Sequence, residues 1–414
     1  MDRQNTVSHD QMNCISCGSQ HPIAAVPSTC TKCEGILDFA QGSTGTQAQD
    51  TNAQGIWRWA AQLPNCHPQN RISLGEGETP LLAVRRLGAA CGLDDLWVKN
   101  DAIMPSGSFK DRAISLATSL ACEYSREGLV LASSGNAGAS GAAYAARAGK
   151  QLLVLVPKTT PGAKLRQIAA AVAKLVTIDG AVSDCVQLAH QVAKNQGWVN
   201  LTTTFHNPYG IEAYATIAYE IAAHRADVVV LPIASGPLLV GMMKGFVRLH
   251  GQGQISRIPR PVAVQSAACA PIVRAYRDGT DISHWAKQDT IASAINDTLD
   301  GYERDGSYTL KWMKRHGGVA VAVDDEALLA GLRSAAQLEG LIFEPSAAIT
   351  IAALPALRTQ GLIAAGERIV VVATGHGLKD LSHVDIDMDR AITPTLATVL
   401  ESLSNKIQEK PFML

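Results

Sequence analysis

Four cysteines near the N-terminus have the spacing of a metal site. Cys14, Cys17, Cys30 and Cys33 form two C-x2-C pairs that are separated by twelve residues. Two such pairs are typical of the knuckles that hold one tetrahedral zinc ion through four thiolates, with no open position for catalysis. A module this small buries little apolar surface, so the metal itself would stabilise its fold. The alternative is four free thiols in a disordered tail.

One lysine is a candidate for covalent chemistry. Lys110 lies in the segment Pro-Ser-Gly-Ser-Phe-Lys-Asp-Arg at 105–112, a Gly/Ser turn that leads into a helical pattern. The dipole at the start of a helix disfavours a cation, so a lysine there is better explained if its amine is used, for example as a neutral imine. The alternative is a solvated lysine beside Asp111.

Three further turns are rich in Gly, Ser, Thr or Asn and run directly into helical patterns. They lie at 133–140, 234–241 and 374–377. In an open α/β sheet, ligands bind beyond the carboxyl ends of the strands, where helix N-termini favour anions. None of the turns is a nucleotide P-loop or a complete dinucleotide-binding motif. The simpler interpretation of any one of them is a tight strand-to-helix turn.

Short apolar segments alternate with helical patterns from residue 96 onward, and these elements would position the turns. The predicted strands are 96–99, 129–132, 152–156, 175–178, 228–232, 261–264, 319–323 and 368–373. The predicted helices are 110–126, 137–148, 183–196, 211–224, 238–249, 325–338 and 347–357. This alternation predicts an α/β protein with parallel sheets that are covered by helices on both faces.

Composition excludes several classes of protein. A length of 414 residues suggests two or three domains, and 36 basic against 37 acidic residues argue against binding to nucleic acid or anionic membranes. The apolar runs are far shorter than the ~20 residues of a membrane-spanning helix, and the first twenty residues lack a secretion signal. A cytoplasmic location is therefore expected. Nine cysteines in such a chain argue against a disulfide framework.

Three motifs occur in the order and spacing of a known family. Ser-Phe-Lys-Asp-Arg at 108–112, Ser-Ser-Gly-Asn-Ala-Gly at 133–138 and Thr-Gly-His-Gly-Leu-Lys-Asp at 374–380 closely resemble threonine synthase, and the last is the most specific. Those enzymes use pyridoxal phosphate and have fold type II, like the tryptophan synthase β-subunit. The resemblance covers about residues 70–385, and Glu-Pro-Ser-Ala-Ala at 344–348 extends it.

The resemblance implies two doubly wound α/β domains behind an N-terminal four-cysteine zinc ribbon. The expected boundaries are a zinc-ribbon-like module at 1–40, a linker at 41–70, a large pyridoxal-phosphate-binding domain at 71–120 and 225–390, a small domain at 121–224, and a C-terminal tail at 391–414. Fold-type II enzymes are commonly dimers, so a homodimer is expected.

The resemblance also implies roles for individual residues. Lys110 would hold pyridoxal phosphate as a Schiff base and then carry protons. Asn136 would contact the pyridoxal 3-oxygen, and Thr374 would face the pyridine nitrogen. The cofactor phosphate would be held by the loop that contains Ser235, Gly236, Leu238 and Leu239. The substrate would be bound by Ser133, Ser134, Asn136 and Asn207. His376 would either order its loop or contact a ligand.

The implied reaction converts O-phospho-L-homoserine and water to L-threonine and phosphate. One departure from the family matters: Gly210 and Ala215 stand where threonine synthases often have basic residues, which are suited to a substrate phosphate. The alternative is a paralogue that performs β-elimination or β-replacement on a smaller amino acid, such as a serine/threonine-type ammonia-lyase or a cysteate-type synthase. A cofactor-free binding protein is less consistent with Lys110, Asn136 and Thr374 together.

Overall fold

The computed structural model describes residues 10–40, 49–160, 162–171, 173–286, 288–384 and 395–400. The chain divides into two compact units, Met1–Lys379 and Asp380–Leu414, and the account below concerns the first. Most of the expected tail at 391–414 and residues 385–390 lie outside the described residues. Within the described ranges, no helix is both long and apolar enough to cross a lipid bilayer.

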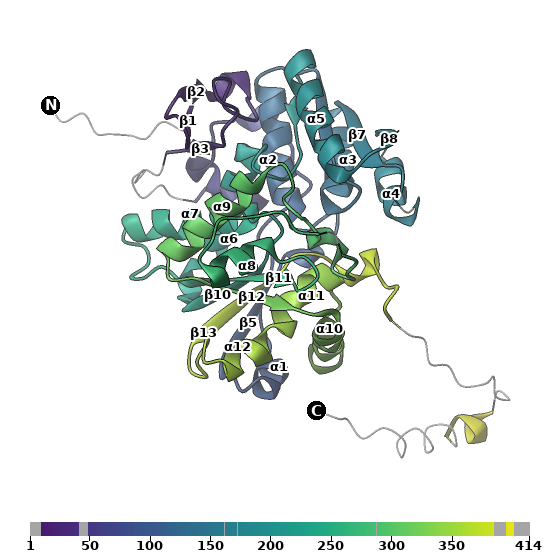
Figure 1. The fold of residues 1–414 in the computed structure, drawn as a ribbon. Coiled ribbons are helices and arrows are strands. Elements are labelled where there is room, and N and C mark those ends of the chain that lie inside the picture. The colour runs from purple at the N-terminus through teal and green to yellow at the C-terminus, as the bar shows by residue number, and fades with distance from the viewer. Residues whose placement is uncertain are drawn as a thin grey trace. The chain divides into compact units, whose positions relative to one another are not determined.

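The first unit contains three sheets (Figure 1). The largest has the strand order β12-β11-β10-β13-β5-β4, in which only β4 is antiparallel to its neighbour. Its strands are β4 Leu81–Ala83, β5 Asp95–Asn100, β10 Val228–Pro232, β11 Arg260–Ser266, β12 Val319–Val323 and β13 Arg368–Ala373. A second sheet, of order β8-β7-β6-β9, is parallel throughout. Its strands are β6 Gly128–Ala132, β7 Gln151–Pro157, β8 Lys174–Ile178 and β9 Val199–Asn200. All eight predicted strands are present.

Helices connect the parallel strands, as the alternating pattern predicts. They are α1 Arg85–Ala90, α2 Lys110–Glu123, α3 Asn136–Ala148, α4 Gly162–Ala169, α5 Val182–Gln196, α6 Pro208–Ile221, α7 Pro237–Gly251, α8 Pro271–Asp278, α9 Glu303–Arg315, α10 Asp325–Glu339, α11 Pro345–Ala352 and α12 Leu354–Thr359. The single helix predicted at 347–357 is two helices, because Pro355 has no N–H to continue the hydrogen bonds of α11 and instead lies in the first turn of α12.

The central strand β10 is buried on both faces, which explains its unbroken apolar sequence. Val229 and Leu231 belong to a core that also contains side chains of α6, α7, α8 and α9. Val228 and Val230 face the opposite core, with side chains of α1, α10, α11 and α12. Figure 1 shows these two groups of helices on opposite sides of the sheet. The predicted arrangement of helices on both faces is confirmed for this sheet.

The N-terminal module is a small antiparallel sheet of order β2-β1-β3, with β1 Gln11–Cys14, β2 Gln20–Pro22 and β3 Leu37–Phe39. Part of the expected linker at 41–70 also folds, as the 3-10 turns Gly55–Gln62. Its residues Ile56 and Trp57 are buried in a core shared with the module and α2. Gly55 has a φ of +63°, and a Cβ there would lie 2.0 Å from the Glu76 carbonyl oxygen, so only glycine fits.

Close packing of α7 against α6 gives a first prediction. A Cβ added at Gly241 of α7 would lie 2.2 Å from the carbonyl oxygen of Ile211 in α6. Gly241→Ala should therefore force the two helices apart and destabilise the protein by about 1–3 kcal/mol. Thermal unfolding measures this change.

Gly251→Ala is the matched control, because Gly251 ends the same helix with open space around the added Cβ. Alanine favours a helix over glycine by up to about 1 kcal/mol, so this variant should be neutral or slightly stabilised. Equal unfolding temperatures for the two variants would contradict the packing argument.

Candidate active site

Three neighbouring strands end at one edge of the large sheet. β13 lies between β10 and β5, and all three are parallel. Their carboxyl ends therefore meet, and each is followed by one of the turns that the sequence singles out. The turn after β5 leads to Lys110, the turn after β10 contains Ser235, and the turn after β13 begins with Thr374. The order of the sheet thus brings together segments that are more than two hundred residues apart.

Backbone hydrogen bonds hold the Lys110 turn against the Thr374 loop. The Phe109 N–H donates to the Thr374 carbonyl at 2.9 Å, and the His376 N–H donates to the Gly107 carbonyl at 3.0 Å. His376 Nδ1 accepts from the Leu378 N–H at 3.1 Å. This last bond supports the interpretation in which His376 orders its own loop.

A second contact joins this edge to the smaller sheet. The Glu344 N–H donates to the Gly375 carbonyl at 3.0 Å, and the Asn136 Nδ2 group donates to Glu344 Oε1 at 2.7 Å. Asn136 begins α3, directly after β6 of the smaller sheet. A Cβ at Gly375 would lie 2.3 Å from the Glu344 carboxyl group, so a larger residue there would displace the Glu344 side chain. Glu344 therefore links the Thr374 loop to Asn136.

Lys110 is the first residue of α2, as the sequence predicts. Its Nζ lies 4.6 Å from the centroid of the Phe109 ring, and it makes no hydrogen bond to any of the described residues. Burial lowers the pKa of the Lys110 amine to about 8, while the negative charges of Glu344 and Asp297 oppose that shift. A substantial fraction of the amine is therefore neutral slightly above physiological pH, and a neutral amine is the nucleophilic form.

Asp297 is a site residue that sequence reasoning missed. Its carboxylate is enclosed, accepts from the Tyr302 hydroxyl at 2.7 Å and from the Leu299 N–H at 3.1 Å, and interacts with the Lys110 charge. Burial raises the pKa of the Asp297 carboxyl group. The residue lies in an irregular segment between β11 and α9, where neither periodicity nor a motif drew attention to it.

The loop after β10 is built to leave backbone N–H groups free at the start of α7. Gly236 has a φ of +98°, and a Cβ there would lie 2.3 Å from the Thr309 side chain. Thr309 Oγ1 donates to the Ser235 carbonyl at 2.6 Å and fixes the loop from behind. Pro237 lacks an N–H, but the next N–H groups of the first turn, at Leu238 and Leu239, have no acceptor within the helix.

Other predicted site residues differ in their surroundings. Ser133 and Ser134 follow β6 and are half-buried, and Ser133 Oγ accepts from the Gly135 N–H at 3.2 Å. Asn207 Oδ1 caps α6 by accepting from the Gly210 N–H at 2.9 Å. The Asn207 Nδ2 group is buried and has no partner in the described chain, so a donor is left over after capping.

Comparison with protein families decides the affiliation. The model of the family described as "Pyridoxal-phosphate dependent enzyme" matches residues 72–375. A threonine synthase from Methanocaldococcus jannaschii is 34% identical over 380 residues, which are 89% of this chain and 92% of that protein. A threonine synthase from Mycobacterium tuberculosis is 35% identical over 324 residues, 77% of this chain and 86% of that one. The chain belongs to the threonine synthase family of pyridoxal-phosphate-dependent enzymes. The resemblance inferred from three motifs is confirmed.

Solved structures of this enzyme class have the same fold. Threonine deaminase isoform 2 from Solanum lycopersicum has a TM-score of 0.63 at 20% identity. The match includes 88% of this chain and 90% of the deaminase chain. Maize serine racemase has a TM-score of 0.64 at 20% identity, and the match includes 87% of this chain and 99% of the racemase chain. At this identity the likeness shows the fold alone. The predicted α/β fold of type II is confirmed, and the protein is a pyridoxal-phosphate-dependent lyase.

The residues at the sheet edge fit pyridoxal phosphate. The buried Ser108 Oγ, two residues from Lys110, has no partner in the described chain, so a polar group at the edge is left over for a ligand. An amine of lowered pKa suits attachment to an aldehyde, and the uncapped first turn of α7 suits a phosphate. Membership of the family and the donors present therefore agree.

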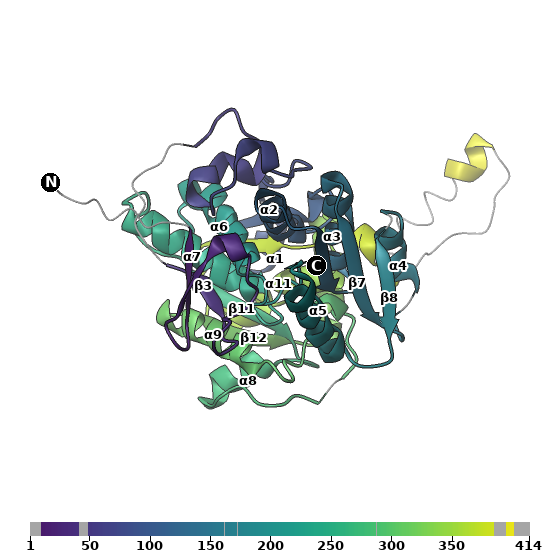
Figure 2. The ribbon, with the colours of Figure 1, turned by 90° about the horizontal axis from the view of Figure 1, so that it is seen from above.

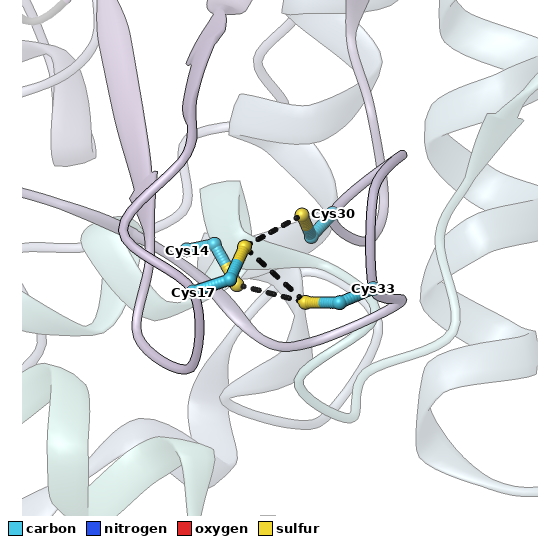
Figure 3. Close-up of side chains that lie close together, drawn as sticks. All are labelled: Cys14, Cys17, Cys30 and Cys33. Atoms are coloured by element: carbon cyan, nitrogen blue, oxygen red, sulfur yellow. Dashed lines mark hydrogen bonds between the residues drawn. The ribbon is translucent and has the colours of Figure 1, made fainter.

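The four N-terminal cysteines converge on one point (Figure 3). Their sulfur atoms all lie within 4.8 Å of one another, with Cys14 and Cys30 buried and Cys17 and Cys33 exposed. A Cβ at Gly35 would lie 2.8 Å from the Cys14 sulfur, so glycine lets the second knuckle close. Four thiols from two knuckles at this separation fit one tetrahedral metal ion.

The electrostatics of Lys110 give a second prediction. The negative charge of Glu344 favours the protonated amine, so Glu344→Gln should lower the pKa of Lys110 below about 8. Only the neutral form of an amine reacts with an aldehyde, so attachment of pyridoxal phosphate to Lys110 should become faster as the pH rises through that pKa. In the variant the midpoint should move to lower pH by roughly half a unit or more.

Stopped-flow absorbance after mixing cofactor-free protein with pyridoxal phosphate measures this pH profile. Glu339→Gln is the control, because the Glu339 carboxylate accepts from the Leu87 N–H of α1 and does not contribute to the pKa shift of Lys110. An unchanged midpoint in Glu344→Gln, or a midpoint at higher pH, would show that Glu344 does not face the amine.

Proposed function

We propose that the protein is a threonine synthase that converts O-phospho-L-homoserine and water to L-threonine and phosphate. The observation that carries the proposal is the 34% identity to a threonine synthase over 89% of this chain and 92% of the relative. Similarity over most of the length of both chains supports a shared activity. The lowered pKa of Lys110 supports the same conclusion.

Bound pyridoxal phosphate would supply an electron sink for the carbon atoms of the substrate. Lys110 would hold the cofactor and, once displaced by the substrate amine, move protons through its Nζ. An amine with a pKa of about 8 accepts and donates protons efficiently near neutral pH. Glu344 and Asp297 would keep the protonated form accessible in a buried place, since both raise the pKa of that amine.

The remaining predicted residues would bind and orient. Ser235 and the N–H groups of Gly236, Leu238 and Leu239 would hold the cofactor phosphate at the start of α7, where the helix dipole favours an anion. Thr374 would face the pyridine nitrogen. A neutral hydroxyl leaves that nitrogen unprotonated, which favours elimination and replacement over transamination.

A second group of residues would receive the amino-acid substrate. Ser133 and Ser134, with the first turn of α3, would bind its carboxylate. Asn136 would contact the cofactor 3-oxygen, for which its amide would have to turn from Glu344. Asn207 would contribute its unpaired Nδ2 donor. A homodimer and a cytoplasmic location, both expected from the sequence, stay predictions.

Neither position that lacks the expected cation has room for a large side chain. Ala215 is fully buried in the core, and its backbone lies against Gly245 of α7, so this position has no room for a basic side chain. Gly210 lies near α2, where a Cβ would approach Ala113 to 2.9 Å and Asn207 to 3.3 Å. The packing at both positions excludes a basic side chain, so a cation that binds a substrate phosphate would have to come from elsewhere in the chain.

Two acidic groups support a second candidate, β-elimination or β-replacement on a smaller amino acid. Asp297 interacts with Lys110, and it raises the pKa of Asp305, which burial already raises, to about 7. Negative charge near Lys110 and the absence of a basic side chain at Gly210 are both unfavourable for binding a dianionic phosphate. This candidate includes serine/threonine-type ammonia-lyase and cysteate-type synthase chemistry.

One set of assays separates the two candidates. The protein is incubated with O-phospho-L-homoserine, threonine, phosphoserine plus sulfite, or diaminopropionate. Phosphate release with threonine formation is the expected result, while 2-oxoacid formation or cysteate formation would favour the second candidate. Lys110→Ala should lose the absorption band at roughly 410–430 nm and all of these activities. A Lys110→Ala protein that keeps both would overturn the proposal as a whole.

We further propose that the four N-terminal cysteines hold a structural zinc ion. Cys14 and Cys30 are buried, and the module has only short strands, so the metal would stabilise the module rather than take part in catalysis.

Freshly reduced protein should contain about one zinc ion per chain. Cys30→Ser should lose the metal and lower the temperature of unfolding, because one of four ligands is gone. Cys122→Ser, which changes a thiol outside the module, should keep the metal. Elemental analysis with thermal unfolding measures both, and a zinc content far below one per chain in wild-type protein would refute the site.

A further inference from the structure

Asp38 in the cysteine module reaches into the catalytic region. It lies on β3, and its side chain is 14% exposed. One carboxylate oxygen accepts from Lys244 Nζ of α7, and the other accepts from the Tyr308 hydroxyl of α9 at 2.6 Å. Figure 2 shows β3 beside α7 and α9. A single carboxylate of the module therefore binds both α7 and α9, two helices that pack on the same face of the large sheet.

These two helices are the ones that frame the loop at Ser235 and Gly236. α7 begins immediately after that loop, and its Lys244 is fully buried with Glu212 as a second partner. In α9, Thr309 follows Tyr308 and donates to the Ser235 carbonyl at 2.6 Å. Adjacent residues of one helix thus contact the module and the loop. The path from Asp38 to Ser235 passes through only two side chains.

The cysteines determine where Asp38 lies. β3 pairs with β1, with Leu37 opposite Cys14 and Asp38 opposite Asn13. The second knuckle closes over Gly35, where an added Cβ would lie 2.8 Å from the Cys14 sulfur, 2.9 Å from Ser16 Oγ and 3.2 Å from the Cys33 sulfur. An ion that joins the four sulfurs would fix both knuckles, and with them the start of β3. The metal would add to the buried apolar side chains that already hold β3, among them Leu37 and Phe39 on either side of Asp38.

Other contacts join the module to the core but do not lead to the cofactor loop. The exposed pair of Glu34 and Lys194 links the module to α5 at 3.5 Å. The Tyr209 hydroxyl donates to the Pro27 carbonyl at 2.9 Å. These contacts attach the module to the core. A variant that weakens one of them, Glu34→Gln, leaves the path through Tyr308 intact and therefore serves as a control.

We propose that Asp38 positions the cofactor-phosphate loop through Tyr308, Thr309 and Lys244, so that metal bound by the four cysteines strengthens the binding of pyridoxal phosphate. The inference rests on Ser235 and Gly236 forming the phosphate loop, as set out above. Tyr308, Thr309 and Asp38 are positioning residues in this account. The module then does more than stabilise the chain, because it makes cofactor affinity depend on metal.

Cofactor titration of the full-length, cofactor-free protein tests this coupling. Tyr308→Phe keeps the ring, which lies 5.4 Å from the Phe205 ring, and removes only the hydroxyl. The Kd for pyridoxal phosphate, followed by absorbance, should rise about fivefold or more, and the Kd for pyridoxal, which lacks the phosphate, should change much less. Asp38→Asn should behave in the same way. Glu34→Gln should leave both affinities as in the wild type.

Metal removal supplies the second arm. Chelation should raise the Kd for pyridoxal phosphate in wild type and in Glu34→Gln by a factor similar to that of Tyr308→Phe, and added zinc should restore it. In Asp38→Asn, chelation should add little, because the carboxylate that leads to both Tyr308 and Lys244 is already changed. If the Kd for pyridoxal phosphate is unchanged by Tyr308→Phe and by chelation, the proposal is wrong. If the Kd for pyridoxal and the Kd for pyridoxal phosphate rise by the same factor, the proposal is also wrong, because the change is then a general structural effect and does not act through the phosphate.

These readouts do not depend on the reaction. If the protein fails to make threonine but shows the expected affinities, the coupling is supported and only the proposed activity is wrong. A protein that makes threonine with unchanged affinities loses only the coupling.

Discussion

Lys110 is held where its positive charge is disfavoured, and the site is arranged around that constraint. Burial removes water from the amine, and the start of α2 presents the positive end of a helix dipole. The negative charges of Glu344 and Asp297 oppose the loss of that charge. The amine is therefore balanced between its two protonation states, which is what proton transfer near neutral pH requires.

The position of α2 depends on a buried ion cluster two residues further along. The Arg112 guanidinium donates to both oxygens of Asp101, at 2.8 and 2.9 Å, and also to Glu220 of α6. Asp101 follows β5 directly, and Glu220 also accepts from Lys99 of β5. Each charge in this cluster has an opposite partner, which compensates for the water it has lost. The end of β5, α2 and α6 are thus joined behind the lysine.

Charged contacts also connect parts of the chain that act at a distance from each other. Lys244 is shared by Asp38 of the N-terminal module and Glu212 of α6, and Arg248 pairs with the same Glu212. These groups are buried, so each depends on the others for its charge to be tolerated. The cysteine module is consequently anchored to α7, the helix that begins directly after Ser235 and Gly236.

The amino-acid sequence by itself determined the alternation of strands and helices, the turn before Lys110 and the paired spacing of the cysteines, because each is a local pattern. The unbroken apolar run of β10 predicted a strand covered on both faces, and the motif around Thr374 predicted the family. The tertiary structure decided which charges face the Lys110 amine, and it revealed Asp297, the bond of Asn136 to Glu344 and the reach of Asp38 to Tyr308. Those contacts join segments up to 270 residues apart. Electrostatic interaction and burial depend on distance in space, and the placement of β13 between β10 and β5 sets those distances here.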